Sequence, residues 1–150
     1  MKSVAQPEIL DQLVTRLNAL RPGTERCWGT MTSAEMLCHL GDCTQSVLTS
    51  AGRKPGRPRP RPFIKWFALY SPVPWLRGRI KTRVEVDPKA GGTKPGDFET
   101  DRRRAIDGLR ALASATAFPP APFMFGVMTA QDWWVWGFKH TDHHLRQFGV

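Results

Sequence analysis

Four histidines are the residues of this chain whose types and spacing could do chemistry: His39, His140, His143 and His144. Residues four apart in a helix stand one above the other, so the imidazoles of His140 and His144 can converge on one point. Zinc sites on helices favour this spacing. His39 is the only histidine elsewhere in the sequence, and a second helix would have to bring it to the pair. The candidate metal ligands are therefore His39, His140 and His144.

Less specific interpretations stay open for each of these residues. A single histidine such as His39 is often a partly buried side chain bonded to a backbone carbonyl, and an i, i+4 pair also arises by chance. Trp133 and Trp136 fall on the same helical stripe as His140 and His144, and such a stripe is typical of a core as well as of a binding site. The combination favours a metal, because helical bundles build metal sites from facing helices.

Other side chains near His39 could take part. Cys43 lies one turn further along and could close a structural zinc site as a fourth, sulfur ligand, or it could be a small core residue. Glu35 and Asp42 flank His39 and are candidate bases for a hydrolytic reaction, although Glu35 also has a capping role. The other two cysteines show no metal-binding spacing, and the sequence contains no phosphate-binding loop or nucleophile elbow.

Four amphipathic helices must position these residues. Apolar side chains recur at helical spacing in each, and Thr32 and Thr129 precede acidic residues in the pattern of a capping box. The expected helices span about 7–20, 32–51, 97–115 and 129–148. A long irregular connection separates the second helix from the third, and within it 63–70 is a short helix or turn. The pattern predicts an all-α four-helix bundle.

Length and composition narrow the class of protein. A chain of 150 residues corresponds to a single domain, 1–150, and 41% apolar with 23% charged residues is ordinary globular usage. No apolar window approaches the ~18 residues of a membrane span, and the first residues show no secretory signal. Three cysteines do not make a disulfide scaffold and fit a reducing compartment. We therefore expect a cytoplasmic protein without a membrane partner.

The net charge of +9 is concentrated in one stretch. Ten basic residues and no acidic one lie between Arg53 and Arg83, whereas the other twelve basic residues are balanced by thirteen acidic ones. Within this stretch, Arg57–Pro62 alternates arginine with proline and should be an extended spacer. It could attract phosphates or carboxylates, or be a solvated loop. Nucleic acid is not favoured as a partner, because no recognition helix or stacking motif accompanies the charge.

Two motifs resemble those of the DinB-like superfamily. Residues 139–149, KHTDHHLRQFG, resemble its closing helix, and residues 28–40, WGTMTSAEMLCHL, are similar to its first ligand motif. Residues 91–98, GGTKPGDF, look like a branch known only as a domain of unknown function. The resemblance covers nearly the whole chain, apart from the arginine-proline segment 53–62. It implies an antiparallel four-helix bundle with a three-histidine site for zinc, nickel or a similar divalent ion.

Carried over position by position, the resemblance implies His39, His140 and His144 as metal ligands and Gln147 as a residue that anchors a ligand or the helix. Characterised relatives include S-transferases that use low-molecular-weight thiols and proteins described as metal-dependent hydrolases, and many are homodimers. The expected function is thus a divalent-metal-dependent thiol S-transferase or hydrolase acting on a small molecule. The alternative is a non-catalytic helical protein that binds a metal, an anionic partner or nucleic acid.

Overall fold

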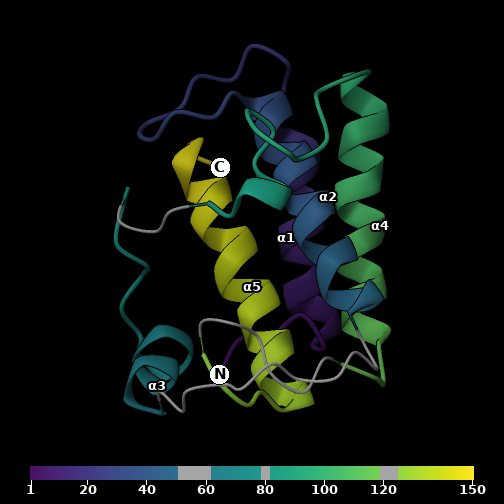
Figure 1. The fold of residues 1–150 in the computed structure, drawn as a ribbon. Coiled ribbons are helices and arrows are strands. Elements are labelled where there is room, and N and C mark those ends of the chain that lie inside the picture. Colours follow the sequence, from purple (N-terminus) through teal and green to yellow (C-terminus); the bar gives the residue numbers. More distant parts are fainter. Residues whose placement is uncertain (51–61, 79–81, 119–124) are drawn as a thin grey trace.

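The computed structural model describes residues 1–50, 62–78, 82–118 and 125–150, and these contain helices and no strand. Four long helices lie side by side (Figure 1), namely α1 (Pro7–Ala19), α2 (Ser33–Thr49), α4 (Phe98–Ser114) and α5 (Ala130–Gln147). A short helix α3 (Pro62–Tyr70) and a 3-10 turn η1 (Val84–Val86) belong to the connection between α2 and α4. The predicted all-α four-helix bundle with a long irregular connection is confirmed.

The helices begin where their capping residues predict. The Thr32 side chain accepts a hydrogen bond from the backbone N–H of Glu35, and the Glu35 carboxylate accepts one from the backbone N–H of Thr32. Thr129 and Asp132 form the same capping box at the start of α5. Each arrangement satisfies two backbone donors that the first helical turn leaves free. The start of α5 is therefore fixed locally.

The long connection determines how the helices run. Arg104 of α4 donates to the backbone carbonyl of Cys38, and further along both helices a side chain on Gly108 would meet Thr44. Residue numbers rise together along the pair, so α2 and α4 run in the same direction, as Figure 1 also shows. Helices joined by shorter loops, α1 with α2 and α4 with α5, run antiparallel, as expected, whereas the expected antiparallel order does not extend to α2 and α4. The connection must therefore return the chain to the end of the bundle where α2 began.

The core of the bundle lies between the four long helices and is mainly aliphatic. It includes fully buried leucines from each of them, among them Leu13, Leu17, Leu37, Leu109, Leu112 and Leu145. The predicted apolar stripes therefore face the interior. Because the core side chains fix the rotation of α2 and α5, they also fix which side of each helix carries the histidines.

Helix α3 lies beside the first part of α5, outside the bundle (Figure 1). Asp132 of α5 holds it there, because its carboxylate accepts hydrogen bonds from the Tyr70 hydroxyl and, at 3.0 Å, from the Lys65 ammonium. The outer side of α3 exposes large apolar side chains, including Phe63 and Trp66. Most of the arginine-proline segment, residues 53–61, and part of the linker before α5, residues 119–124, lie outside the described residues.

None of the helices in the described ranges combines the length and the apolar composition that crossing a bilayer requires.

Candidate metal centre

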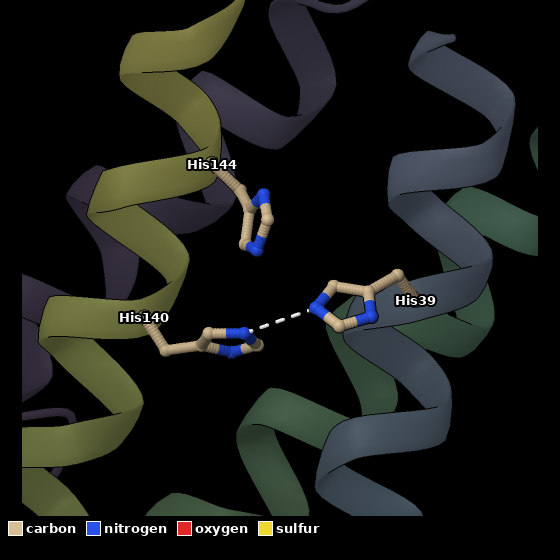
Figure 2. A group of neighbouring side chains, drawn as sticks. All are labelled: His39, His140 and His144. Carbon is tan, nitrogen blue, oxygen red and sulfur yellow. Dashed lines mark hydrogen bonds between the residues drawn. The ribbon is translucent and has the colours of Figure 1, made fainter. Parts of the chain in front are cut away.

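The structure brings together the three histidines singled out by the sequence. His39 extends from α2, and His140 and His144 extend from α5 toward it (Figure 2). The Nε2 atoms of His39 and His140 are 3.1 Å apart. One nitrogen of each ring can be chosen so that all three lie within 4.8 Å of one another. Side chains about a hundred residues apart in the chain thus form one cluster of nitrogen donors.

The cluster is enclosed by protein. His39 and His140 are 4% and 8% exposed, and His144 is less deeply buried as a whole residue although its imidazole is enclosed. The Trp136 indole stacks on the His140 imidazole with the ring planes 13° apart. The Trp133–Trp136 stripe therefore serves both interpretations, because Trp133 packs in the core while Trp136 covers a histidine of the cluster.

The long connection orients His39. Its Nδ1 lies 2.7 Å from the backbone carbonyl oxygen of Val86, in η1. A carbonyl oxygen only accepts hydrogen bonds, so Nδ1 carries the proton and donates. In the neutral imidazole, Nε2 then has a free lone pair, and this is the nitrogen that faces His140. Metal-binding histidines are commonly held in this way, with one nitrogen bonded to a carbonyl and the other free for the ion.

Gln147 orients His144 in a similar manner. Its side-chain oxygen lies 3.1 Å from Nδ1 of His144, which leaves Nε2 free. Gln147 is itself 3% exposed, so its amide has little freedom to turn away. Gly29 lies against it, and a β-carbon at this position would overlap the Gln147 amide nitrogen. The backbone of Gly29 also has a φ of 84°, a region that favours glycine.

Burial keeps the three imidazoles neutral. Desolvation lowers the pKa of His39, and it holds the pKa of His140 and of His144 well below the usual value of 6.5. The neighbouring imidazoles of His144 and His39 also lower the pKa of His140, because a second positive charge in the cluster is unfavourable. Neutral imidazole is the form that binds a metal ion. The electrostatics of the site therefore favour ligation at neutral pH and below.

The donor set fits a divalent transition metal. Imidazole nitrogens bind zinc at about 2.0–2.1 Å, which in a tetrahedral site places two of them about 3.4 Å apart. The separation of 3.1 Å between His39 and His140 is close to that spacing. Imidazole suits zinc, copper, iron and nickel, whereas calcium and magnesium prefer oxygen ligands. The residues present thus fit the zinc or nickel ion expected from the sequence, and do not fit a calcium or magnesium site.

Cys43 lies beside the cluster and is not a member of it. Its Sγ is 3.6 Å from Nε2 of His39, yet no group of potential ligands found in the described ranges includes it with all three histidines. Burial raises the pKa of the Cys43 thiol to about 12, so the thiol is protonated when no metal lies beside it. The arrangement supports the interpretation of Cys43 as a small buried residue rather than a fourth ligand. Three nitrogen donors without a fourth are typical of catalytic zinc sites.

The two carboxylates that flank His39 are engaged elsewhere. Glu35 closes the capping box of α2 and lies 3.8 Å from the Lys89 ammonium. Asp42 accepts hydrogen bonds from the backbone and hydroxyl of Thr93 and from Arg104. Among the described residues, no carboxylate groups with the three histidines. A hydrolytic base therefore cannot be assigned to Glu35 or Asp42.

His143 is not a member of the three-histidine group. Its ring packs against Trp28, with the centroids 4.7 Å apart, and against Trp75, at 5.8 Å. Trp75 also contacts His140, with the centroids 6.1 Å apart. His143 and Trp75 thus form a layer of side chains beside the cluster.

Two parts of the site were missed by the sequence analysis. The Val86 carbonyl is a backbone atom, and no residue type marks it. Trp75 lies in a proline-rich segment, where no helical pattern predicts its direction. The glycines that follow η1 could have indicated a tight turn there, because a β-carbon on Gly92 would lie 2.8 Å from the backbone of Asp87. Such tight turns between bundle helices indicate a connection with a defined structure.

Comparison with known proteins agrees with this arrangement. The family model described as DinB superfamily matches residues 4–148. The match includes both histidine motifs and nearly all of the chain. No curated protein and no solved structure matches this sequence.

Proposed function

The chain belongs to the DinB superfamily, and from this premise we propose that His39, His140 and His144 hold a divalent metal ion, zinc or nickel, in a site that acts on a small molecule. The observation that carries the proposal is the convergence of three buried, neutral imidazoles from two helices. Both His39 and His144 have the second ring nitrogen occupied by a hydrogen-bond partner, which leaves the other free for ligation.

Thiol transfer is the reaction that the site supports best. A divalent ion bound here would lower the pKa of a coordinated thiol or water and supply a nucleophile at neutral pH. Hydrolysis is commonly assisted by a general base, and the two candidate carboxylates, Glu35 and Asp42, are engaged by the α2 cap and by Thr93 and Arg104. Three neutral imidazoles bring no negative charge, so an anionic thiolate suits the charge balance of the loaded site. The proposed enzyme is therefore a metal-dependent S-transferase that uses a low-molecular-weight thiol.

The ligand assignment is tested by the metal content of single variants. His39→Ala and His144→Ala should each lose the metal found in the purified protein by elemental analysis. His143→Ala is the matched control, because it removes the same side chain from the same helix, next to a proposed ligand, and should keep the metal. Circular dichroism checks that all three variants remain helical. Equal metal content in the three would refute the assignment.

The reaction is tested on the loaded protein with a panel of thiols. Each thiol is offered with an aryl halide whose thioether product absorbs visible light, and ester hydrolysis is measured in parallel. We expect thiol transfer that requires the metal and is lost in His39→Ala. Ester hydrolysis without thiol transfer would favour the hydrolase, and metal binding without either activity would favour the non-catalytic alternative.

A further inference from the structure

A cavity of about 520 Å³ lies beside the histidine cluster and is not used by the proposed function. It is bounded by α5, by residues 69–77 at and after the end of α3, and by the first two residues of the chain. In Figure 1 the chain that follows α3 runs alongside α5. Ligand pockets for small organic molecules have volumes of this order. Its wall includes the aromatic side chains of Trp28, Tyr70, Trp75 and Phe138.

Positive charge in the wall of this cavity is only partly neutralised. The lining residues described by the structure include four cations, Lys2, Arg77, Lys139 and Arg146, and one acid, Asp142. Asp142 is already paired, at 2.7 Å with Arg16 and at 4.0 Å with Arg146.

Three of the four cations form no ion pair among the described residues: Lys2, Arg77, and Lys139, whose ammonium donates to the backbone carbonyls of Ser71 and Val73. Lys2 lies over the ring of Phe138, with the ammonium 5.8 Å from the centroid, and Arg77 lies over Trp28 at 6.0 Å. Cation–π contacts hold a charge in place without neutralising it. The Trp28 indole N–H is in addition a buried donor without an acceptor. The cavity therefore combines flat apolar walls with donors that lack an anion.

One layer of side chains separates this cavity from the cluster. His143 lines the cavity, and its ring centroid is 5.3 Å from that of His144. Trp75 lines it as well and contacts His140. The Trp75 indole donates a 2.7 Å hydrogen bond to the backbone carbonyl of Ala68, in α3. A molecule in the cavity would thus lie within one side chain's width of the proposed ligands.

We propose that this cavity binds an organic anion with a flat apolar body, with its carboxylate or similar acidic group at Arg77 and Lys2 and its body between Trp28, Trp75 and Phe138. A cationic ligand would meet repulsion from the lining residues, and a small inorganic anion would leave the aromatic walls unused. The inference rests on the proposed function only in treating this anion as a substrate of the neighbouring site. It also assigns a role to one residue of the basic stretch, Arg77.

The test measures binding to the full-length protein after chelator treatment, so that it does not depend on metal. Calorimetric titration compares 4-phenylbutyrate with its neutral amide, 4-phenylbutyramide, and with inorganic phosphate alone. The carboxylate should bind about tenfold or more tightly than the amide, because it can form a bidentate ion pair with a guanidinium, whereas the amide offers only a neutral acceptor. Phosphate alone should bind weakly, because it cannot use the apolar walls.

Variants assign the binding to this cavity. Arg77→Gln should weaken 4-phenylbutyrate binding about tenfold and leave the amide unchanged, and Lys2→Gln should act in the same direction. Arg110→Gln is the matched control, since Arg110 is an exposed arginine of α4 away from the cavity. Equal affinity for carboxylate and amide, or equal effects of Arg77→Gln and Arg110→Gln, would overturn the proposal. Anion binding by protein that takes up no metal would refute the proposed function and leave this inference standing.

Discussion

Replacing Gly29 with alanine should weaken metal binding without changing any proposed ligand. The new β-carbon would overlap the side-chain amide of Gln147, whose oxygen accepts the hydrogen bond from Nδ1 of His144. Gln147 is buried, so its amide can yield only by giving up that bond. Losing a partner that orients a metal-binding histidine typically lowers metal affinity about 10- to 100-fold, or roughly 1.4–2.7 kcal/mol.

The same substitution also affects folding, and the two effects can be separated. Alanine at the Gly29 φ of 84° costs about 1–3 kcal/mol of stability. Gly149→Ala is the matched control: its φ is 72°, so the backbone penalty is similar, but its β-carbon would make only an ordinary 3.5 Å contact with the Cys27 sulfur. Gln147→Ala completes the comparison by removing the hydrogen bond without backbone strain.

The assay is competition for zinc with a coloured chelator, alongside urea unfolding of the metal-free proteins. We expect Gly29→Ala and Gln147→Ala to lose affinity to a similar extent, and Gly29→Ala to lose at least as much stability as Gly149→Ala, because it adds the contact with Gln147 to the backbone penalty. If Gly149→Ala lost as much zinc affinity as Gly29→Ala, backbone strain rather than the Gln147 contact would be responsible. Unchanged affinity in Gln147→Ala would refute the role given to that side chain.

Four further predictions concern the cluster itself. Cys43→Ser should retain full metal content in elemental analysis, whereas loss of half or more would make the sulfur a ligand. Burial lowers the pKa of His39, His140 and His144, so zinc occupancy measured by dialysis should stay level from pH 8 to about 6.5 and fall only below it, as the imidazoles become protonated. In the metal-free protein, the unfolded chain binds protons at its imidazoles at a higher pH than the folded chain does. The free energy of unfolding should therefore be level above about pH 6.5 and decrease below it. A decrease that begins near pH 8 would contradict the buried, neutral state. Zinc at about 100 times its dissociation constant should raise the free energy of unfolding by about 2.7 kcal/mol, and in His39→Ala this gain should largely disappear.

The sequence predicted the helices well because their signals are local. The capping boxes at Thr32 and Thr129 determine where α2 and α5 begin, to within one residue of the expected positions. From these starts, the helical spacing alone places His140 and His144 on one side of α5. The prediction that His39 would join them depended on bundle packing, which apolar stripes indicate but do not prove.

The sequence did not predict the relative direction of α2 and α4, or the contacts that backbone atoms make with the site. The parallel run of α2 and α4 depends on where the chain between Thr49 and Phe98 travels, and no residue pattern in that stretch reports its path. The three imidazoles of the cluster could be predicted from residue types. The Val86 carbonyl, which determines the nitrogen of His39 that carries the proton, could not. The pairing of Tyr70 and Lys65 with Asp132, which attaches α3 to α5, likewise joins residues far apart in sequence.

Both features that the sequence did not predict, the helix direction and the backbone contact to His39, depend on the connection between α2 and α4. Its turn η1 presents the Val86 carbonyl to His39, and its segment after α3 places Trp75 against His140. Helix packing can bring three imidazoles near one another, but it does not determine which nitrogen of each ring carries the proton. A second hydrogen bond does, and for His39 that bond comes from the connection rather than from the bundle. The bundle therefore supplies the three proposed ligands, whereas the connection leaves Nε2 of His39 available for a metal and forms one wall of the neighbouring cavity.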